Sequence, residues 1–180
     1  MNILNKHFTL LSLCFIFLLN SCSNKIWKIQ SENSITNRIS NCKVSTQIVK
    51  YKCWMLKFEK LKSNLLKAGL INDKPIKPVI IEIPSPDGDV IKFEMYQSQT
   101  MSPELAKQFP ELKSYMGNAV ADKSTTIRAN INETGFHALI TSTKGQWLVE
   151  PYCIRKSKDF YCCYWKSDFK SNREPFNENR

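Results

Sequence analysis

The chain has 180 residues, which is enough for one domain with a hydrophobic core but not for two domains of ordinary size. Hydrophobic residues make up 42% and aromatic residues 11% of it, so the composition excludes a chain that is disordered throughout. The 26 Lys and Arg residues outnumber the 16 Asp and Glu residues and give a net charge of +10. This charge favours an anionic partner, whether a membrane, a nucleic acid or an acidic protein surface.

The N-terminal segment has the features of an export signal. Lys6 gives it a positive start, and the apolar run over residues 8–19 is shorter than the roughly 20 residues that a membrane-spanning helix needs. The run ends in the sequence LNSC at residues 19–22, which resembles the lipobox of bacterial lipoproteins. The resemblance implies that residues 1–21 are a signal peptide and that Cys22 carries a lipid, which anchors the exported chain to a membrane of the cell envelope.

Ordinary secretion is the alternative to a lipid anchor. In that case the signal is cleaved after Ser23, with Ser21 and Ser23 as the small residues that signal peptidases require. An uncleaved anchor is a third and less favoured interpretation. All three lead out of the cytoplasm, and the first two differ in whether the mature chain is membrane-anchored or secreted as a soluble protein.

The next segments predict a linker and a long helix. Residues 22–47 are rich in Asn, Ser, Lys and Gln, which is typical of a flexible tether. Over residues 51–68 apolar residues recur in steps of three and four, as on one face of a helix. Gly69 follows where a helix C-cap is expected. The residues of this apolar stripe are Trp54, Met55, Phe58, Leu61, Leu65 and Ala68.

From residue 78 onward the pattern changes to strands. Residues 78–83 and 90–96 flank a turn rich in Pro, Asp and Gly and predict a β-hairpin. Ser102 as N-cap, followed by Pro and Glu, begins a short helix that runs to Gln108. Four further strands are then predicted as an antiparallel meander, at residues 124–131, 136–141, 146–151 and 159–166.

These elements predict one α+β domain over residues 48–169. Its antiparallel β-sheet, a hairpin plus a meander, is expected to pack with one long and one short helix. Residues 170–180 are polar and predict a disordered tail.

The cysteines predict one disulfide candidate. Cys14 leaves with the signal and Cys22 carries the lipid, so an odd number of five remains and at least one thiol is free or pairs between chains. If a two-residue turn lies at residues 157–158, Cys153 and Cys162 face each other across the hairpin and are candidates for a cross-strand disulfide. Cys163 then points to the opposite face as a free thiol.

Five segments of the second half of the chain form an ordered series: residues 102–117 (SPELAKQFPELKSYMG), 124–128 (STTIR), 135–140 (GFHALI), 149–152 (VEPY) and 161–166 (YCCYWK). Upstream, the predicted hairpin at residues 80–96 carries a Pro-Asp-Gly turn. In order and spacing these segments resemble the prodomain of secreted bacterial zinc metalloproteases of the reprolysin-like type. The resemblance extends over roughly residues 44–169.

In that family the prodomain precedes a catalytic domain with a zinc-binding HExxH helix, assists its folding and blocks its cleft. Here His137 is followed by Ala-Leu-Ile-Thr and no HExxH is present, so no catalytic residue, metal ligand or cofactor is assigned and the chain is not expected to be an enzyme. The partners expected are a zinc metalloprotease catalytic domain and, through the lipid, a membrane. The alternatives are an envelope structural lipoprotein without a protease partner and a truncated remnant of a protease precursor.

Some residues invite sharper hypotheses. His137 and Arg128 lie on predicted strands, where a sheet-face histidine and an exposed arginine are commoner than a catalytic or carboxylate-binding role. The aromatic residues Tyr161, Tyr164 and Trp165 could stack on bases, but no RNA-binding signature surrounds them, so a nucleic-acid partner is not expected. A free cysteine acting as a nucleophile, or binding the zinc of a partner protease, is the least favoured hypothesis.

Overall fold

The computed structural model describes residues 25–39, 42, 44, 47–71, 77–99, 102–153 and 156–170. The predicted signal peptide, Cys22 and the tail beyond residue 170 lie outside these described residues. Within them, one antiparallel sheet dominates and three short α-helices accompany it, so the fold is α+β with a large excess of sheet.

The sheet has nine strands in the order β1-β2-β9-β8-β7-β6-β5-β4-β3, and every neighbouring pair is antiparallel. The strands are β1 Trp27–Gln30, β2 Lys52–Leu56, β3 Val79–Pro84, β4 Val90–Ser98, β5 Lys113–Ala119, β6 Thr126–Asn132, β7 Gly135–Ser142, β8 Gly145–Pro151 and β9 Phe160–Trp165. The helices are α2 Glu32–Thr36, α3 Phe58–Leu65 and α4 Pro103–Gln108, and a 3₁₀ turn η1 spans Lys166–Asp168.

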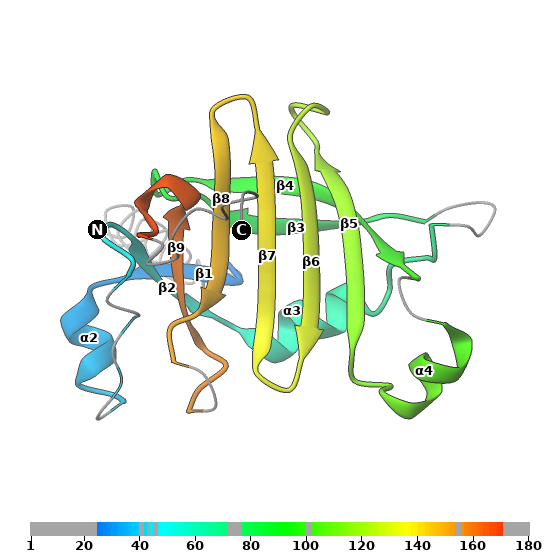
Figure 1. Cartoon of the computed structure of the whole chain (residues 1–180), viewed down its shortest axis with the longest axis horizontal. Coiled ribbons are helices and arrows are strands. Elements are labelled where there is room, and N and C mark those ends of the chain that lie inside the picture. Colours follow the sequence, from blue (N-terminus) through cyan, green and yellow to red (C-terminus); the bar gives the residue numbers. More distant parts are fainter. Residues whose placement is uncertain are drawn as a thin grey trace, which may run out of the picture.

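The sheet curls into a half-barrel. Strands β5 to β8 lie side by side, and β3 and β4 run across behind them (Figure 1). The two edge strands come close to each other, because the indole Nε1 of Trp27 on β1 donates a hydrogen bond to the carbonyl oxygen of Glu82 on β3 at 2.7 Å. The curl therefore encloses one face of the sheet and leaves the other face outside.

The main core fills the enclosed face. Alternate residues of the strands point into it, because side chains alternate between the two faces of a strand. Helix α3 adds the buried side chains of Phe58, Leu61 and Leu65. Burial of a side chain of this size stabilises the fold by about 1.5–3 kcal/mol. The fully buried strand residues include Ile81, Ile83, Phe93, Met95, Phe136, Ile140, Val149 and Tyr161.

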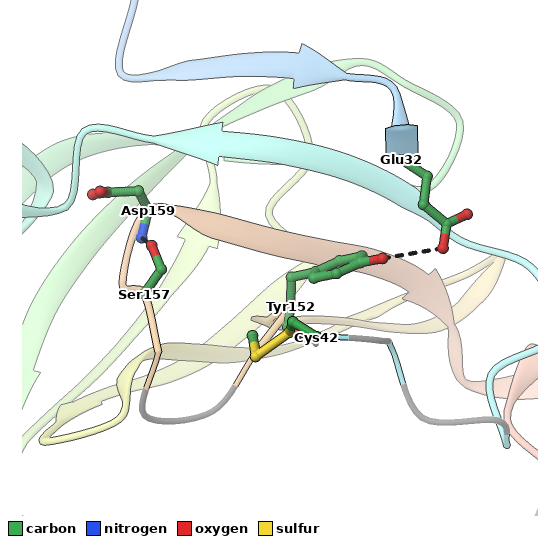
Figure 2. The surroundings of a disulfide bond; sticks show 6 residues. Glu32, Cys42, Tyr152, Ser157 and Asp159 are labelled. Atoms are coloured by element: carbon green, nitrogen blue, oxygen red, sulfur yellow. Dashed lines mark hydrogen bonds between the residues drawn. A yellow bond between two sulfur atoms is a disulfide. The ribbon is translucent and has the colours of Figure 1, made fainter. Parts of the chain in front are cut away.

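A second apolar cluster lies on the outer face of β2, β9 and β8. It comprises Ile35, Cys42, Ile48, Cys53, Tyr152, Phe160, Cys162 and Tyr164. The residues that cover this part of the sheet are held by a disulfide between Cys42 and Cys153, whose Cα atoms are 5.9 Å apart. The carboxylate of Glu32 on α2 accepts a hydrogen bond from the hydroxyl of Tyr152 at 3.0 Å (Figure 2). It accepts a second one from the hydroxyl of Tyr51 at 2.7 Å.

Several predicted elements are confirmed. The hairpin corresponds to β3 and β4, and the meander to β6, β7, β8 and β9. The short helix is α4, and the Ser102 hydroxyl accepts a hydrogen bond from the Leu105 amide at 3.3 Å, as expected of an N-cap. Strand β5 was not predicted.

The prediction of one long helix over residues 51–68 is wrong in its first third. Residues 52–56 form strand β2, and only Phe58–Leu65 is helical. Both faces of β2 are covered: Trp54 and Leu56 contribute to the main core, and Cys53 to the outer cluster. A strand buried on both faces reads as a continuous apolar run, which helical spacing can also match.

The prediction of a flexible tether over residues 22–47 is also wrong for the part of this segment that the structure describes, since β1 and α2 lie within it. Despite the polar composition of this segment, Trp27 and Ile35 are 2% and 0% exposed. Burial of these two large apolar side chains helps to attach the segment to the sheet, together with the Cys42–Cys153 disulfide.

The predicted disulfide between Cys153 and Cys162 is replaced by the Cys42–Cys153 bond. Strand β8 ends at Pro151, which pairs with Tyr161, so the residue opposite Cys162 is Glu150. The connection between β8 and β9 is thus longer than the two-residue turn on which the prediction depended, and Cys153 lies beyond the paired residues. Cys162 and Cys163 are both free thiols and point to opposite faces of β9.

Candidate binding groove on the outer face of the sheet

A groove of about 440 Å³ lies on the outer face of the central strands. Its outward-pointing side chains come from five neighbouring strands, β4 to β8. They are Ser98, Ser114, Met116, Arg128, Asn130, His137, Leu139, Leu148 and Glu150. We call this surface the outer groove.

The strand register arranges these side chains in two rows. In one row Ser114 lies opposite Asn130, which lies opposite His137. In the adjacent row Met116, Arg128, Leu139 and Leu148 follow one another across four strands. A polar row thus runs beside a largely apolar one, because side chains two residues apart on a strand share a face.

His137 is held in place by the turn between β6 and β7. Its Nε2 lies 2.8 Å from the hydroxyl of Thr134, and that hydroxyl donates its one proton to the side-chain oxygen of Asn132 at 2.6 Å. Nε2 must therefore be the donor to Thr134, which leaves Nδ1 of the neutral ring as an acceptor. The side-chain oxygen of Asn132 also accepts from the Thr134 amide, so the same network shapes the turn.

The protonation state of His137 follows from its surroundings. Burial disfavours the imidazolium and lowers the pKa of His137 below 6.5, and the nearby carboxylate of Glu150 opposes this shift in part. The ring is therefore predominantly neutral at pH 7. Glu150 itself accepts a hydrogen bond from the hydroxyl of Tyr164 at 2.7 Å, which fixes the carboxylate at one end of the groove.

Arg128 supplies the positive charge of the groove. It is exposed, and none of the ion pairs among the described residues involves it. A guanidinium is a planar donor that suits carboxylates. The outer groove thus combines a cation, a neutral acceptor and a carboxylate with the apolar side chains of Leu139 and Leu148, a combination that suits a polypeptide segment with polar backbone groups and apolar side chains.

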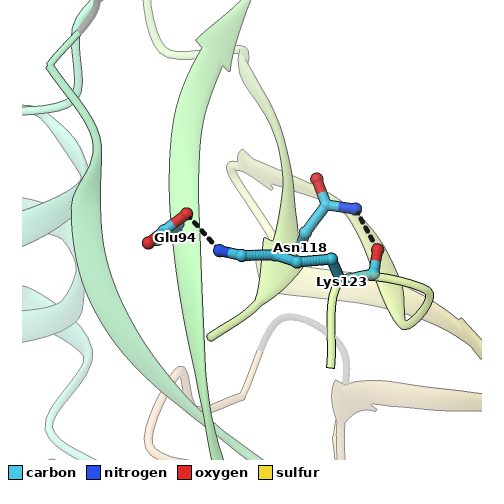
Figure 3. A network of polar contacts seen from close by, with 3 residues as sticks. All are labelled: Glu94, Asn118 and Lys123. Carbon is cyan, nitrogen blue, oxygen red and sulfur yellow. Dashed lines mark hydrogen bonds and ion pairs between the residues drawn. The ribbon is translucent and has the colours of Figure 1, made fainter. Parts of the chain in front are cut away.

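The loop that leads into β6 is fixed by polar contacts on the same side of the sheet. Lys123 forms an ion pair with Glu94 on β4 at 2.6 Å, and the side-chain Nδ2 of Asn118 donates to the carbonyl oxygen of Lys123 at 2.8 Å (Figure 3). The pair is exposed and therefore contributes little stability. Asp122 accepts hydrogen bonds from Ser124 and Thr125, which lower the pKa of its carboxyl group.

The three free cysteines that the structure describes are poorly suited to nucleophilic chemistry. Cys53, Cys162 and Cys163 are buried free thiols, and desolvation raises the pKa of Cys53 to about 11 and that of Cys162 to about 12. The pKa of Cys163 is raised as well, for the same reason. Such thiols are protonated at neutral pH, whereas a nucleophilic cysteine needs a stabilised thiolate.

A second hollow of about 310 Å³ lies at another end of the sheet, where Asp87, Asp89 and Asp122 lie near Trp147 and Trp165. Among the described residues, no group of three or more His, Cys, Asp or Glu side chains is placed to hold a metal ion.

Of the residues singled out in the sequence, the structure brings Arg128 and His137 into one groove with Glu150. The sequence alone does not place Glu150 in this groove, because its position there depends on the register of β7 and β8.

Comparisons of the chain with protein-family models, with curated proteins and with solved structures found no match. In the part of the chain that the structure describes, no helix is long and apolar enough to cross a membrane.

Proposed function

We propose that this chain is an exported, non-catalytic binding protein, anchored to the cell envelope through a lipid on Cys22. Its partner is a zinc metalloprotease catalytic domain, which it binds and thereby chaperones or inhibits. The single observation that carries the proposal is that the segments with prodomain resemblance supply the two charged residues and the histidine that line one surface. Arg128, His137 and Glu150 come from three of the five segments and meet in the outer groove.

Other residues of the resembling segments have roles in the fold. A Cβ atom at Gly117 would overlap the carbonyl oxygen of Glu94, so β4 and β5 approach too closely for any other residue. Gly135 has a φ of 133°, and the next amide, of Phe136, donates to the hydroxyl of Tyr161 at 3.0 Å. These two glycines therefore meet specific demands of this backbone.

The disulfide supports export. Cys42 and Cys153 are 111 residues apart in the sequence and are bonded in the structure. Disulfides of this kind form and persist in oxidising compartments such as the periplasm or the cell surface. A disulfide-bonded domain behind a lipobox-like sequence therefore suits an envelope lipoprotein.

The charge supports a protein partner with an acidic surface. Removal of residues 1–21 takes away Lys6 and lowers the net charge from +10 to +9, which still attracts negatively charged surfaces over distances of about 10 Å at ordinary ionic strength. Within the groove itself, Arg128 is the charge that a carboxylate of the partner would contact. We therefore expect the association rate to fall as the salt concentration rises.

Affinity capture tests the proposal. The full chain, purified in detergent, serves as bait for an envelope extract of the cell that produces it, and captured proteins are identified by mass spectrometry and assayed for metalloprotease activity. The matched control bait is Arg128→Glu, which reverses one exposed charge on the groove. The proposal is supported if the native chain captures an HExxH protease and the Arg128→Glu bait captures less of it. Recovery of none contradicts it and favours an envelope structural lipoprotein.

A further inference from the structure

Two of the free cysteines lie directly opposite each other. Cys53 on β2 pairs with Cys162 on β9 in the antiparallel register. Both side chains belong to the outer apolar cluster, where they are 5% and 3% exposed. They therefore project from adjacent strands toward the same side of the sheet.

The hydrogen bonding of these strands identifies the kind of pair. The amide of Leu56 donates to the carbonyl oxygen of Asp159 at 2.7 Å, which makes Leu56 and Asp159 a hydrogen-bonded position in the register of β2 and β9. Hydrogen-bonded and non-hydrogen-bonded positions alternate along an antiparallel pair. The pair Cys53 and Cys162 lies three positions along the register from the pair Leu56 and Asp159. An odd number of steps changes the kind of position, so Cys53 and Cys162 occupy a non-hydrogen-bonded position.

This position brings the two thiols within bonding range. Opposite Cα atoms at a non-hydrogen-bonded position are roughly 4.5 Å apart, which falls within the range of roughly 4.4–6.8 Å that disulfides require. No other described thiol competes for either partner: Cys163 projects into the main core on the opposite face, and Cys42 and Cys153 are bonded to each other.

We propose that Cys53 and Cys162 form a second disulfide, across β2 and β9, when the chain is exported into an oxidising compartment. The oxidant is a protein or small-molecule disulfide. The Cys53 thiolate attacks it and releases one of its sulfurs as a thiol, and the Cys162 thiolate then attacks Cys53 and releases the other sulfur. Two cysteine S–H groups are lost and one S–S bond forms, while the disulfide of the oxidant is reduced to two thiols.

The bond forms most readily during folding. In the folded chain both thiols are buried and their pKa values are raised to about 11 and 12, so little thiolate is present at neutral pH and an oxidant has poor access. Before α2 and the segment around Cys42 cover this part of the sheet, both thiols are open to exchange. Cys163 then remains as the one unpaired thiol of the domain.

The second bond would act together with the first. Once Cys42–Cys153 has formed, the additional loop closed by Cys53–Cys162 consists only of residues 43–52 and 154–161. The gain in stability from this short loop is smaller than that from the first bond, because the loss of unfolded-state entropy grows with loop length. Its main effect is to hold the strand register of β2 and β9 beneath α2 and Cys42, which cover the outer apolar cluster.

Peptide mapping tests the proposal. The full chain is exported from its own leader in a bacterial host, alkylated under denaturing conditions without reductant and digested. The digest is then searched for linked peptides. We expect two linked pairs, Cys42–Cys153 and Cys53–Cys162, with Cys163 alkylated. In Cys53→Ala, Cys162 should become alkylated, whereas Cys163→Ala should leave both links intact.

A parallel sample is denatured, reduced and refolded with reduced and oxidised glutathione, so that the result does not depend on the host. Recovery of Cys53 and Cys162 as alkylated thiols in the refolded, oxidised protein would overturn the proposal. Linkage of either residue to a different cysteine would also overturn it.

Discussion

The indole Nε1 of Trp27 donates a hydrogen bond to the carbonyl oxygen of Glu82 at 2.7 Å and so connects β1 to β3, the two edges of the curled sheet. The ring also packs edge-on against Tyr161, at 5.3 Å between centroids. An exposed edge strand invites pairing with other chains. In this fold the first strand closes over the core and brings its edge toward the last strand of the sheet order.

We predict that Trp27 is a major contributor to stability. Replacing Trp27 by Ala should lower the free energy of unfolding by about 3–5 kcal/mol because a large buried side chain is lost. The milder Trp27→Phe, which removes the N–H donor, should cost about 1–3 kcal/mol. Urea denaturation measures both. The control Phe109→Ala, at an exposed aromatic residue, should change stability by less than about 0.5 kcal/mol. Equal stability of Trp27→Ala and the native chain would mean that this segment is a tether after all.

Three glycines should differ in their tolerance of alanine. Gly145 has a φ of 127° but only distant neighbours, so Gly145→Ala should cost about 1–3 kcal/mol from backbone strain alone. Gly135→Ala should cost more, because its Cβ would also lie 2.9 Å from the hydroxyl of Tyr161. Gly117→Ala should be the worst, since its Cβ would overlap the backbone of β4. Thermal unfolding of the three variants gives the order, and a Gly117→Ala variant as stable as Gly145→Ala would contradict the close approach of β4 and β5.

His137 should make stability depend on pH in the weakly acidic range. Its pKa is below 6.5 in the folded chain and about 6.5 in the unfolded chain, so between these values the unfolded chain binds more protons. The free energy of unfolding therefore falls as the pH drops below 6.5 toward the folded pKa. Replacing His137 by Gln should flatten this part of the stability curve.

A direct titration checks the same point. After removal of residues 1–21, His137 is the one remaining histidine, so its ring signals in an NMR titration are unambiguous. Replacing Glu150 by Gln should lower the pKa of His137 further, because the carboxylate favours the imidazolium. Glu111→Gln, at an exposed residue outside the groove, is the control. A pKa at or above 6.5 in the native chain would contradict the burial of this ring.

The lipid anchor is tested at its attachment residue. If the lipobox is real, Cys22→Ser should block processing, and the precursor should stay uncleaved and take up no labelled palmitate. Electrophoresis of cell fractions from cells fed with labelled fatty acid shows both effects. Release of the variant as a soluble protein cut after Ser23 would instead mean ordinary secretion.

Local signals account for the parts of the fold that the sequence predicted. The hairpin and the meander combine alternating apolar residues with Gly, Asn and Asp turns, and both signals lie within a few residues. Residues 52–56 have no such signal, because both faces of β2 are buried. Trp27 finds its hydrogen-bond partner 55 residues away, a distance that no local pattern reaches, so the segment reads as a polar tether.

The candidate site was predictable only in part. Alternation along β6 and β7 places Arg128 and His137 on strand faces, but their neighbourhood with Glu150 depends on the register between strands. The same limit explains the disulfide: the partners of Cys153 and Cys162 follow from where β8 ends, at Pro151. A register shift of a few residues exchanges every cross-strand partner.

The central claim, that this chain binds a zinc metalloprotease, is tested most directly by calorimetric titration of the purified chain into the HExxH proteases of the cell that produces it. We expect saturable one-to-one binding to at least one of them. The Arg128→Glu variant should bind the same protease about tenfold or more weakly, which is equivalent to about 1.4 kcal/mol. The absence of binding to every such protease, with the native chain folded and its Cys42–Cys153 disulfide intact, would contradict the account.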